Sequence, residues 1–106
     1  MASAVNPDGD NSRPDASITV NVTRYDPELG LRTWWDGEAV LRAEVWEDPE
    51  RTVVISGNPA GLRSLARHLL TLVQEGVPSG RHLDFDTYGG VLSDDSVAIR
   101  VEVEKG

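Results

Sequence analysis

Aromatic and acidic side chains gather between residues 34 and 47 and are the groups of this sequence best suited to binding. Trp34 and Trp35 are adjacent, and carboxylates follow them along a predicted pair of strands. Aromatic anchors carry much of the energy of protein interfaces, and negative charge steers a cationic partner. We therefore predict a partner-binding surface from Trp34, Trp35, Asp36, Glu38, Glu44 and Glu47. Because side chains alternate along a strand, these six lie on both faces of a sheet and only some can share one surface. The alternative is that the tryptophans pack within the sheet, with Trp46 in the core.

Groups that could catalyse a reaction are few. The chain has no cysteine, one lysine (Lys105) and two histidines, His68 and His82. A histidine base needs an oriented acid and a nucleophile, and no spacing here supplies them. We predict that both histidines are solvated and that the protein is not an enzyme.

Two further patterns have a structural and a ligand-binding interpretation. Residues 56–61 join a predicted strand to a helix, where an anion could bind, but they lack the Lys-Ser/Thr of a phosphate loop. Four carboxylates could supply oxygen ligands to a divalent cation: Asp84, Asp86, Asp94 and Asp95. A capped turn explains the first pattern, and a wet strand face followed by a turn explains the second. We therefore predict no cofactor and no metal.

The net charge of −8 limits the class of partner. Nucleic acids and anionic lipids bind surfaces rich in Lys and Arg, so neither is an expected partner. A basic protein is favoured, and the alternative is that the charge only keeps a small protein in solution. Apolar runs are too short to span a membrane, and residues 1–17 do not resemble a signal peptide, so we expect a cytoplasmic protein.

The elements that must position these groups can be predicted from the hydrophobic pattern. Residues 1–16 have no apolar period and predict a disordered arm, and residues 17–106 predict a single α+β domain. Alternation or apolar runs predict strands over residues 18–23, 31–35, 38–46, 52–56, 81–86 and 96–103. Asp36-Gly37 is typical of a two-residue hairpin turn, and the 52–56 strand, with three consecutive apolar residues, predicts a central strand covered on both faces. The expected fold is an antiparallel sheet of five or six strands with one helix on one face.

The helix has clear signals at both ends. Asn58 is a suitable N-cap, Pro59 suits the first helical position, and Gly76 is suited to end the helix. An arc of apolar side chains predicts the face that packs on the sheet: Leu62, Leu65, Ala66, Leu69, Leu70, Leu72 and Val73.

The second half of the chain resembles the immunity protein 32 family of bacterial polymorphic-toxin systems. The residues that carry the resemblance are the 52–56 strand, Gly57-Asn58, the leucine pattern Leu62-x-x-Leu65-Ala66-x-x-Leu69, the Gly-Val-Pro-Ser-Gly turn of residues 76–80 and the last strand. The resemblance covers about residues 52–103. It implies an α+β cytoplasmic protein that binds a cognate toxin and blocks it without catalysis. It assigns no functional residues, and the alternative is a small structural domain that self-associates as a homo-oligomer through an uncovered sheet face.

Overall fold

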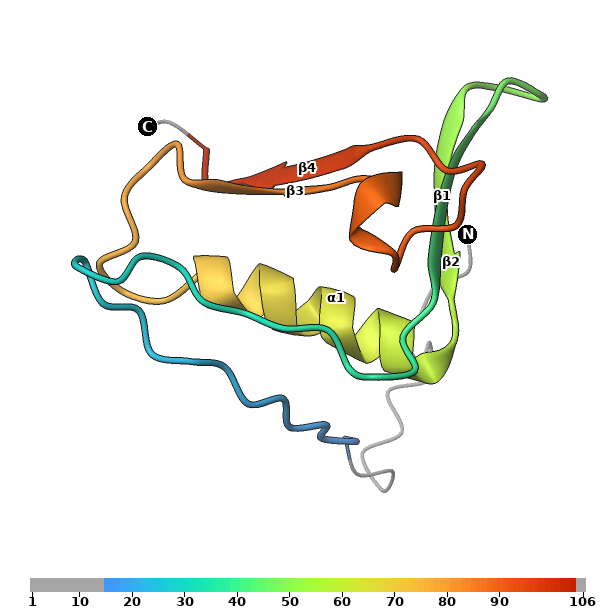
Figure 1. Cartoon of the computed structure of the whole chain (residues 1–106). Coiled ribbons are helices and arrows are strands. Elements are labelled where there is room, and N and C mark those ends of the chain that lie inside the picture. The colour runs from blue at the N-terminus through green and yellow to red at the C-terminus, as the bar shows by residue number, and fades with distance from the viewer. Residues whose placement is uncertain (1–14, 105–106) are drawn as a thin grey trace.

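The computed structural model describes residues 15–104, which form one α-helix and two separate antiparallel pairs of strands (Figure 1). The first pair is β1–β2 and the second is β3–β4. The α+β class is confirmed, but the single sheet of five or six strands is wrong. Most of the predicted disordered arm, residues 1–14, lies outside the described residues. The elements are β1 (Leu41–Trp46), β2 (Thr52–Gly57), α1 (Pro59–Leu72), β3 (His82–Phe85), the 3₁₀ helix η1 (Thr87–Gly89) and β4 (Ile99–Glu102).

Residues 15–40, here called the N-terminal segment, run alongside α1 without forming a strand (Figure 1). The strands predicted over residues 18–23 and 31–35 are therefore wrong. The backbone groups of this segment bond instead to side chains of α1 and of the turn after it: Arg67 of α1 donates to the carbonyls of Asn21 and Trp34, and Gln74 of the turn donates to that of Thr23. A polar backbone group that has a side-chain partner needs no neighbouring strand.

The predicted hairpin at Asp36-Gly37 is also wrong. A turn does occur there, closed by a hydrogen bond from the Ala39 N–H to the Asp36 carbonyl (3.0 Å), but it leads from the N-terminal segment into β1. The turn signal was correct, and the prediction failed because residues 31–35 pair with no strand.

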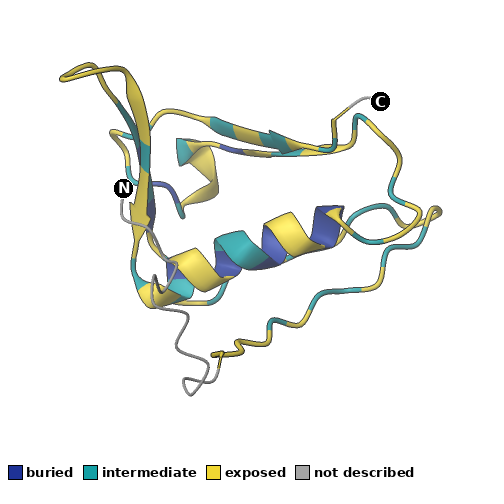
Figure 2. Ribbon diagram, turned by 180° about the vertical axis from the view of Figure 1, so that it is seen from behind, coloured by how far each residue is buried: buried dark blue, intermediate teal, exposed yellow. Residues whose placement is uncertain are grey.

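The β1–β2 pair stands across the N-terminal end of α1 (Figure 1). Its register places Leu41 opposite Gly57 and Trp46 opposite Thr52. The far edge of β1 is covered by residues 91–97, which bond to the backbone of Leu41 and Ala43. Strand β2 is mostly exposed (Figure 2), so the prediction of a central strand covered on both faces is wrong.

The signals at the start of α1 are confirmed. The Asn58 side chain accepts a hydrogen bond from the Gly61 N–H (2.7 Å), and Pro59 begins the helix. The helix ends at Leu72, before Gly76, which has a positive φ in the turn that follows.

The buried side of α1 is largely polar, so the predicted apolar face is confirmed only in part: Leu72 is buried, and Leu65 and Ala66 are partly buried. Gly61, Leu72 and the polar side chains Ser64, Arg67, His68 and Thr71 are buried, whereas Leu62, Leu69, Leu70 and Val73 are exposed. The small core contains Leu41, Ala43, Phe85 and Leu92, with Trp35 and Leu65 among the partly buried side chains packed against it.

The exposed leucines of α1 line two shallow grooves. One, of about 430 Å³, lies between the end of α1 and Val101 and Val103, while the other, of about 460 Å³, lies between the start of α1 and residues 18–20. Exposed apolar surface of this kind marks protein contacts more often than catalysis. No helix within residues 15–104 is long and apolar enough to cross a membrane.

Candidate protein-binding surface

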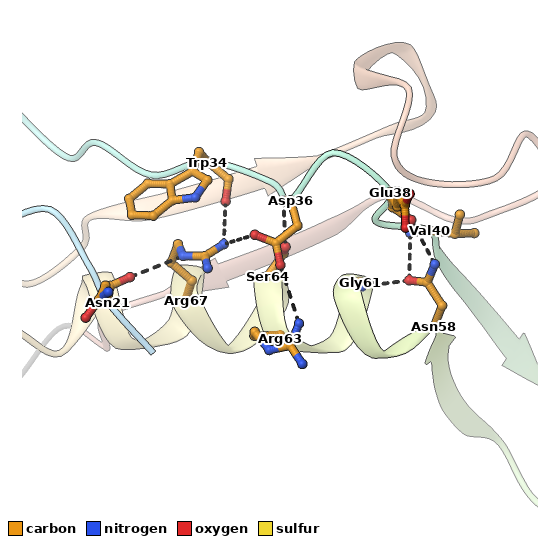
Figure 3. Close-up of polar contacts among 10 residues, drawn as sticks. All are labelled: Asn21, Trp34, Asp36, Glu38, Val40, Asn58, Gly61, Arg63, Ser64 and Arg67. Carbon is orange, nitrogen blue, oxygen red and sulfur yellow. Dashed lines mark hydrogen bonds and ion pairs between the residues drawn. The ribbon is translucent and has the colours of Figure 1, made fainter. Parts of the chain in front are cut away.

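The six side chains predicted to bind a partner fall into two groups. Residues 34–38 lie along α1 (Figure 3), and Glu44 and Glu47 lie on the β1–β2 hairpin. Trp34 and Glu38 are exposed, while Trp35 and Asp36 are partly buried. The structure thus separates the set into side chains that a partner can reach and side chains that hold the fold.

Asp36 is bound to α1 through a network of charged and polar groups (Figure 3). Its carboxylate pairs with the buried Arg67 guanidinium at 3.0 Å and with the exposed Arg63 guanidinium at 3.7 Å. Its backbone N–H donates to the Ser64 hydroxyl at 2.9 Å. The Arg67 guanidinium also lies 4.3 Å from the centre of the Trp34 ring, a cation–π contact. The network holds the N-terminal segment on the helix and orients Trp34.

Asn58 joins three parts of the chain at the start of α1 (Figure 3). Its side-chain oxygen accepts from the N–H groups of Gly61 and Val40, and its amide group donates to the Glu38 carbonyl at 2.8 Å. A side chain of the protein itself thus bonds to an N–H group at the start of α1, where an anion could otherwise bind. This supports the capped-turn interpretation of residues 56–61.

Trp35 belongs to an aromatic cluster in the core. Its ring centre lies 4.2 Å from that of His68 and 5.2 Å from that of Phe85. His68 is only 2% exposed, so the prediction that both histidines are solvated is wrong for His68 and correct for His82. The Nδ1 of His68 lies 2.7 Å from the Ser64 carbonyl, which can only accept, so Nδ1 carries the proton.

This geometry does not prepare His68 for catalysis. It bonds to the carbonyl of Ser64, whereas the hydroxyl of Ser64 already accepts from Asp36. Burial lowers the pKa of His68 from its ordinary value of 6.5; the hydrogen bond to Ser64 opposes this shift, and the nearby Arg67 charge adds to it. The ring is a neutral part of the core.

The lowered pKa of His68 predicts a loss of stability in mild acid. Above about pH 6.5 the ring is neutral in both states; below it the unfolded chain gains a proton that the folded protein excludes. We expect the free energy of unfolding to fall by up to about 1.4 kcal/mol per pH unit from this residue until the folded-state pKa is reached. Urea unfolding between about pH 7 and pH 5 measures the slope, which His68→Gln should reduce. Equal slopes for wild type and His68→Gln would exclude this origin.

Three of the four carboxylates considered as metal ligands bond to separate partners, and the fourth, Asp94, is exposed. Asp84 bonds to Arg100 at 2.7 Å, which lowers the pKa of that carboxyl, and Asp86 accepts from the N–H groups at the start of η1. Asp95 accepts from the Ser93 hydroxyl, which lowers its pKa, and pairs with Arg42. Among residues 15–104 no three His, Asp or Glu side chains are grouped so that they could hold a metal ion.

The β1–β2 hairpin carries an exposed acidic surface with one tryptophan. Because Leu41 and Ala43 are buried on the inner face, Glu44 and Trp46 lie on the outer face. Trp46 is 52% exposed, and its indole N–H donates to Glu44 at 3.3 Å. The prediction of a core role for Trp46 is wrong, and its sequence position, next to an acidic turn, was the signal for exposure. Beyond it the turn carries Glu47, Asp48 and Glu50, all exposed, with Arg51 paired to Glu47 at 3.5 Å.

These features define a small α+β protein whose exposed groups suit binding to another protein. A family model described as Immunity protein 32 matches residues 52–104, which run from β2 through α1 to the end of β4 and make up half of the chain. The chain belongs to the immunity protein 32 family. No curated protein and no solved structure matches it significantly.

The matched region contains β2, α1, β3 and β4, but neither the N-terminal segment nor β1. All six side chains predicted to bind a partner therefore lie outside it, as does Trp46. The family match supports the fold of the second half, and the binding surface must be argued from charge and exposure.

Proposed function

We propose that this chain is a cytoplasmic immunity protein that binds a cognate protein toxin and neutralises it without catalysis. Membership of the immunity protein 32 family carries the proposal. The net charge of −8 and the absence of a prepared nucleophile among the described residues are consistent with it. An acidic inhibitor suits a toxin with a basic cleft, such as one that binds nucleic acid, because opposite charge accelerates association and fixes orientation.

The surface that best fits this role is the outer face and turn of the β1–β2 hairpin. It includes Glu44 and Glu47 from the sequence-based set and adds Trp46. Trp34 and Glu38 are also accessible to a partner, while Trp35 packs in the core and Asp36 pairs with α1. The exposed Trp46 is of the aromatic type that is enriched in interfaces, and the acidic side chains around it suit the polar rim of a contact with a cationic partner.

The first experiment identifies the partner. The tagged chain is used to capture proteins from a lysate of its source cells at low and high salt. We expect a basic polypeptide that high salt releases, because exposed charge pairs are screened. Expression of that polypeptide alone should be toxic, and co-expression of this chain should remove the toxicity. A captured protein that is harmless alone would contradict the proposal.

The second experiment locates the surface on the captured toxin. Trp46→Ala is expected to weaken binding by about 30-fold or more, as loss of an interface anchor typically does. Tyr88→Ala is the matched control, because Tyr88 is an aromatic residue that is 95% exposed on η1, which is not part of the hairpin. Titration calorimetry gives both affinities. If folded Trp46→Ala binds as wild type does, the hairpin is not the interface, and the apolar side of α1 is tested next with Leu69→Gln.

A further inference from the structure

Strand β2 has an open edge. The Asn58 N–H donates to the Val40 carbonyl, so residues 58 and 40 form a hydrogen-bonded pair. In the β1–β2 register every second residue back from Asn58 then also faces β1. Since backbone groups in an antiparallel ladder point alternately to one neighbour and to the other, residues 52, 54 and 56 bond to β1. The N–H and C=O groups of Val53, Ile55 and Gly57 point outward. Within residues 15–104 no backbone hydrogen bond is made to these outward groups.

This edge lacks the features that usually protect a strand from pairing. Proteins protect open edges with charged side chains, prolines or bulges. Residues 52–57 contain no charged side chain and no proline, and β2 pairs with β1 without a bulge. The apolar side chains of Val53 and Ile55 are 67% and 40% exposed. By contrast, the other edge of the same sheet is covered by residues 91–97. The open edge therefore suits a second strand.

We propose that β2 pairs with β2 of a second copy of this chain, antiparallel and centred on Val54. In this register Val53 lies opposite Ile55 of the second copy, and Gly57 lies opposite its Arg51. It therefore pairs the backbone of Arg51, Val53, Ile55 and Gly57 of each copy. A shift by two residues that centres the pair on Ile55 would still pair Val53, Ile55 and Gly57, but it would set Arg51 opposite Pro59, which has no N–H. The two sheets become one, with the order β1–β2–β2–β1.

Charge favours a second copy as the occupant. In an antiparallel pair the start of each β2 lies beside the end of the other, so the acidic turn that precedes one β2 lies beside the N-terminus of the α1 that follows the other. That helix has no acidic side chain in its first turn. Negative charge at a helix N-terminus is stabilising, so each copy supplies what the other lacks.

The dimer is compatible with toxin binding and does not depend on it. Pairing along the edge of β2 leaves the outer face of the hairpin uncovered, because the two copies are related by an axis perpendicular to the sheet. Glu44 and Trp46 of both copies then lie on the same face.

A single introduced cysteine tests the register, because the chain has no cysteine of its own. In the proposed dimer, Val54 lies directly opposite itself at a pair without hydrogen bonds, where side chains approach closely enough for a disulfide. Under mild oxidation we expect most Val54→Cys chains to become disulfide-linked. Glu44→Cys is the matched control, since Glu44 is the β1 partner of Val54 and lies one strand further from the axis. Equal cross-linking of the two variants would overturn the register.

Mass as a function of concentration tests the dimer itself. We expect sedimentation equilibrium to show a dimer for wild type and Ile55→Thr, and at least a tenfold weaker dimer for Ile55→Pro, which removes an outward N–H while leaving the β1 bonds intact. If Ile55→Pro fails to fold by circular dichroism, Val53→Lys replaces it, since a charge on the edge opposes pairing. A wild-type protein that stays monomeric at millimolar concentration would overturn the proposal, whatever its binding to a toxin.

Discussion

Arg67→Ala is expected to destabilise the protein by about 3 kcal/mol and to release the N-terminal segment from α1. The Arg67 side chain is only 8% exposed and pairs with Asp36 at 3.0 Å. Its removal leaves the Asp36 carboxylate without its closest cation and the carbonyls of Asn21 and Trp34 without their donor. The loss is large because these groups stay partly buried while their partner is gone. Urea unfolding gives the free energy, and hydrogen exchange at the Tyr25 and Asp36 amides reports the release of the segment.

Arg63→Ala is the matched control for this prediction. Arg63 pairs with the same carboxylate, but at 3.7 Å and with half of its side chain exposed. Exposed ion pairs contribute less than about 1 kcal/mol, so we expect a small change and unaltered exchange at both amides. If the two substitutions had similar effects, burial of the guanidinium would not be the reason that the segment stays on the helix.

The same network explains why the sequence predicted the buried side of α1 only in part. Ser64, Arg67, His68 and Thr71 recur at the i, i+3, i+4, i+7 spacing of one helical face, just as the leucines do. The sequence-based prediction assigned the leucine face to the core because it is the more hydrophobic of the two. In the structure each of the four polar side chains has a partner: a backbone N–H, a carboxylate, a carbonyl or an aromatic ring. Burial of a polar group costs little once it is hydrogen-bonded. The partners of Ser64 and Arg67 belong to Asp36, 28 and 31 residues away, whereas His68 and Thr71 bond to carbonyls one turn back in the helix.

Local signals were read correctly where their chemistry is local. Asn58 and Pro59 define the start of α1, as predicted. The strands at residues 41–46, 52–57, 82–85 and 99–102 were also predicted, and most of the predicted ends lie a few residues outside the observed ones. The Asn58 cap needs only a side chain and an N–H three residues ahead.

Pairing between strands was predicted less well, because it depends on distant residues. The 18–23 segment alternates like a strand, yet its backbone carbonyls accept hydrogen bonds from Arg67 of α1 and from Gln74 in the turn after the helix. For the same reason the candidate surface could only be predicted in part: the sequence indicates acidic and aromatic side chains, but not that Trp35 enters the core while Trp46 stays outside. Which strand face is buried is decided by the neighbours that cover it.

A close contact between α1 and the start of β1 leads to the second large prediction. A Cβ atom added to Gly61 would lie 2.1 Å from the Val40 carbonyl oxygen and 2.9 Å from its carbon. Both are backbone atoms, and they are fixed in place by the bonds of Val40 to Asn58. Real Cβ atoms do not approach backbone atoms so closely, so the helix and the strand would have to move apart.

Gly61→Ala is therefore expected to destabilise the protein by about 2 kcal/mol or more. Helix propensity alone predicts the opposite sign, because alanine stabilises a helix interior by about 0.5–1 kcal/mol relative to glycine. Gly37→Ala is the matched control, since no atom lies within 4 Å of its added Cβ, and we expect a change of less than about 0.5 kcal/mol. Thermal and urea unfolding of the three proteins decide between the two effects. A Gly61→Ala protein more stable than wild type would mean that α1 does not lie against Val40, and the Asn58 bonds that fix the start of β1 would then be in doubt as well.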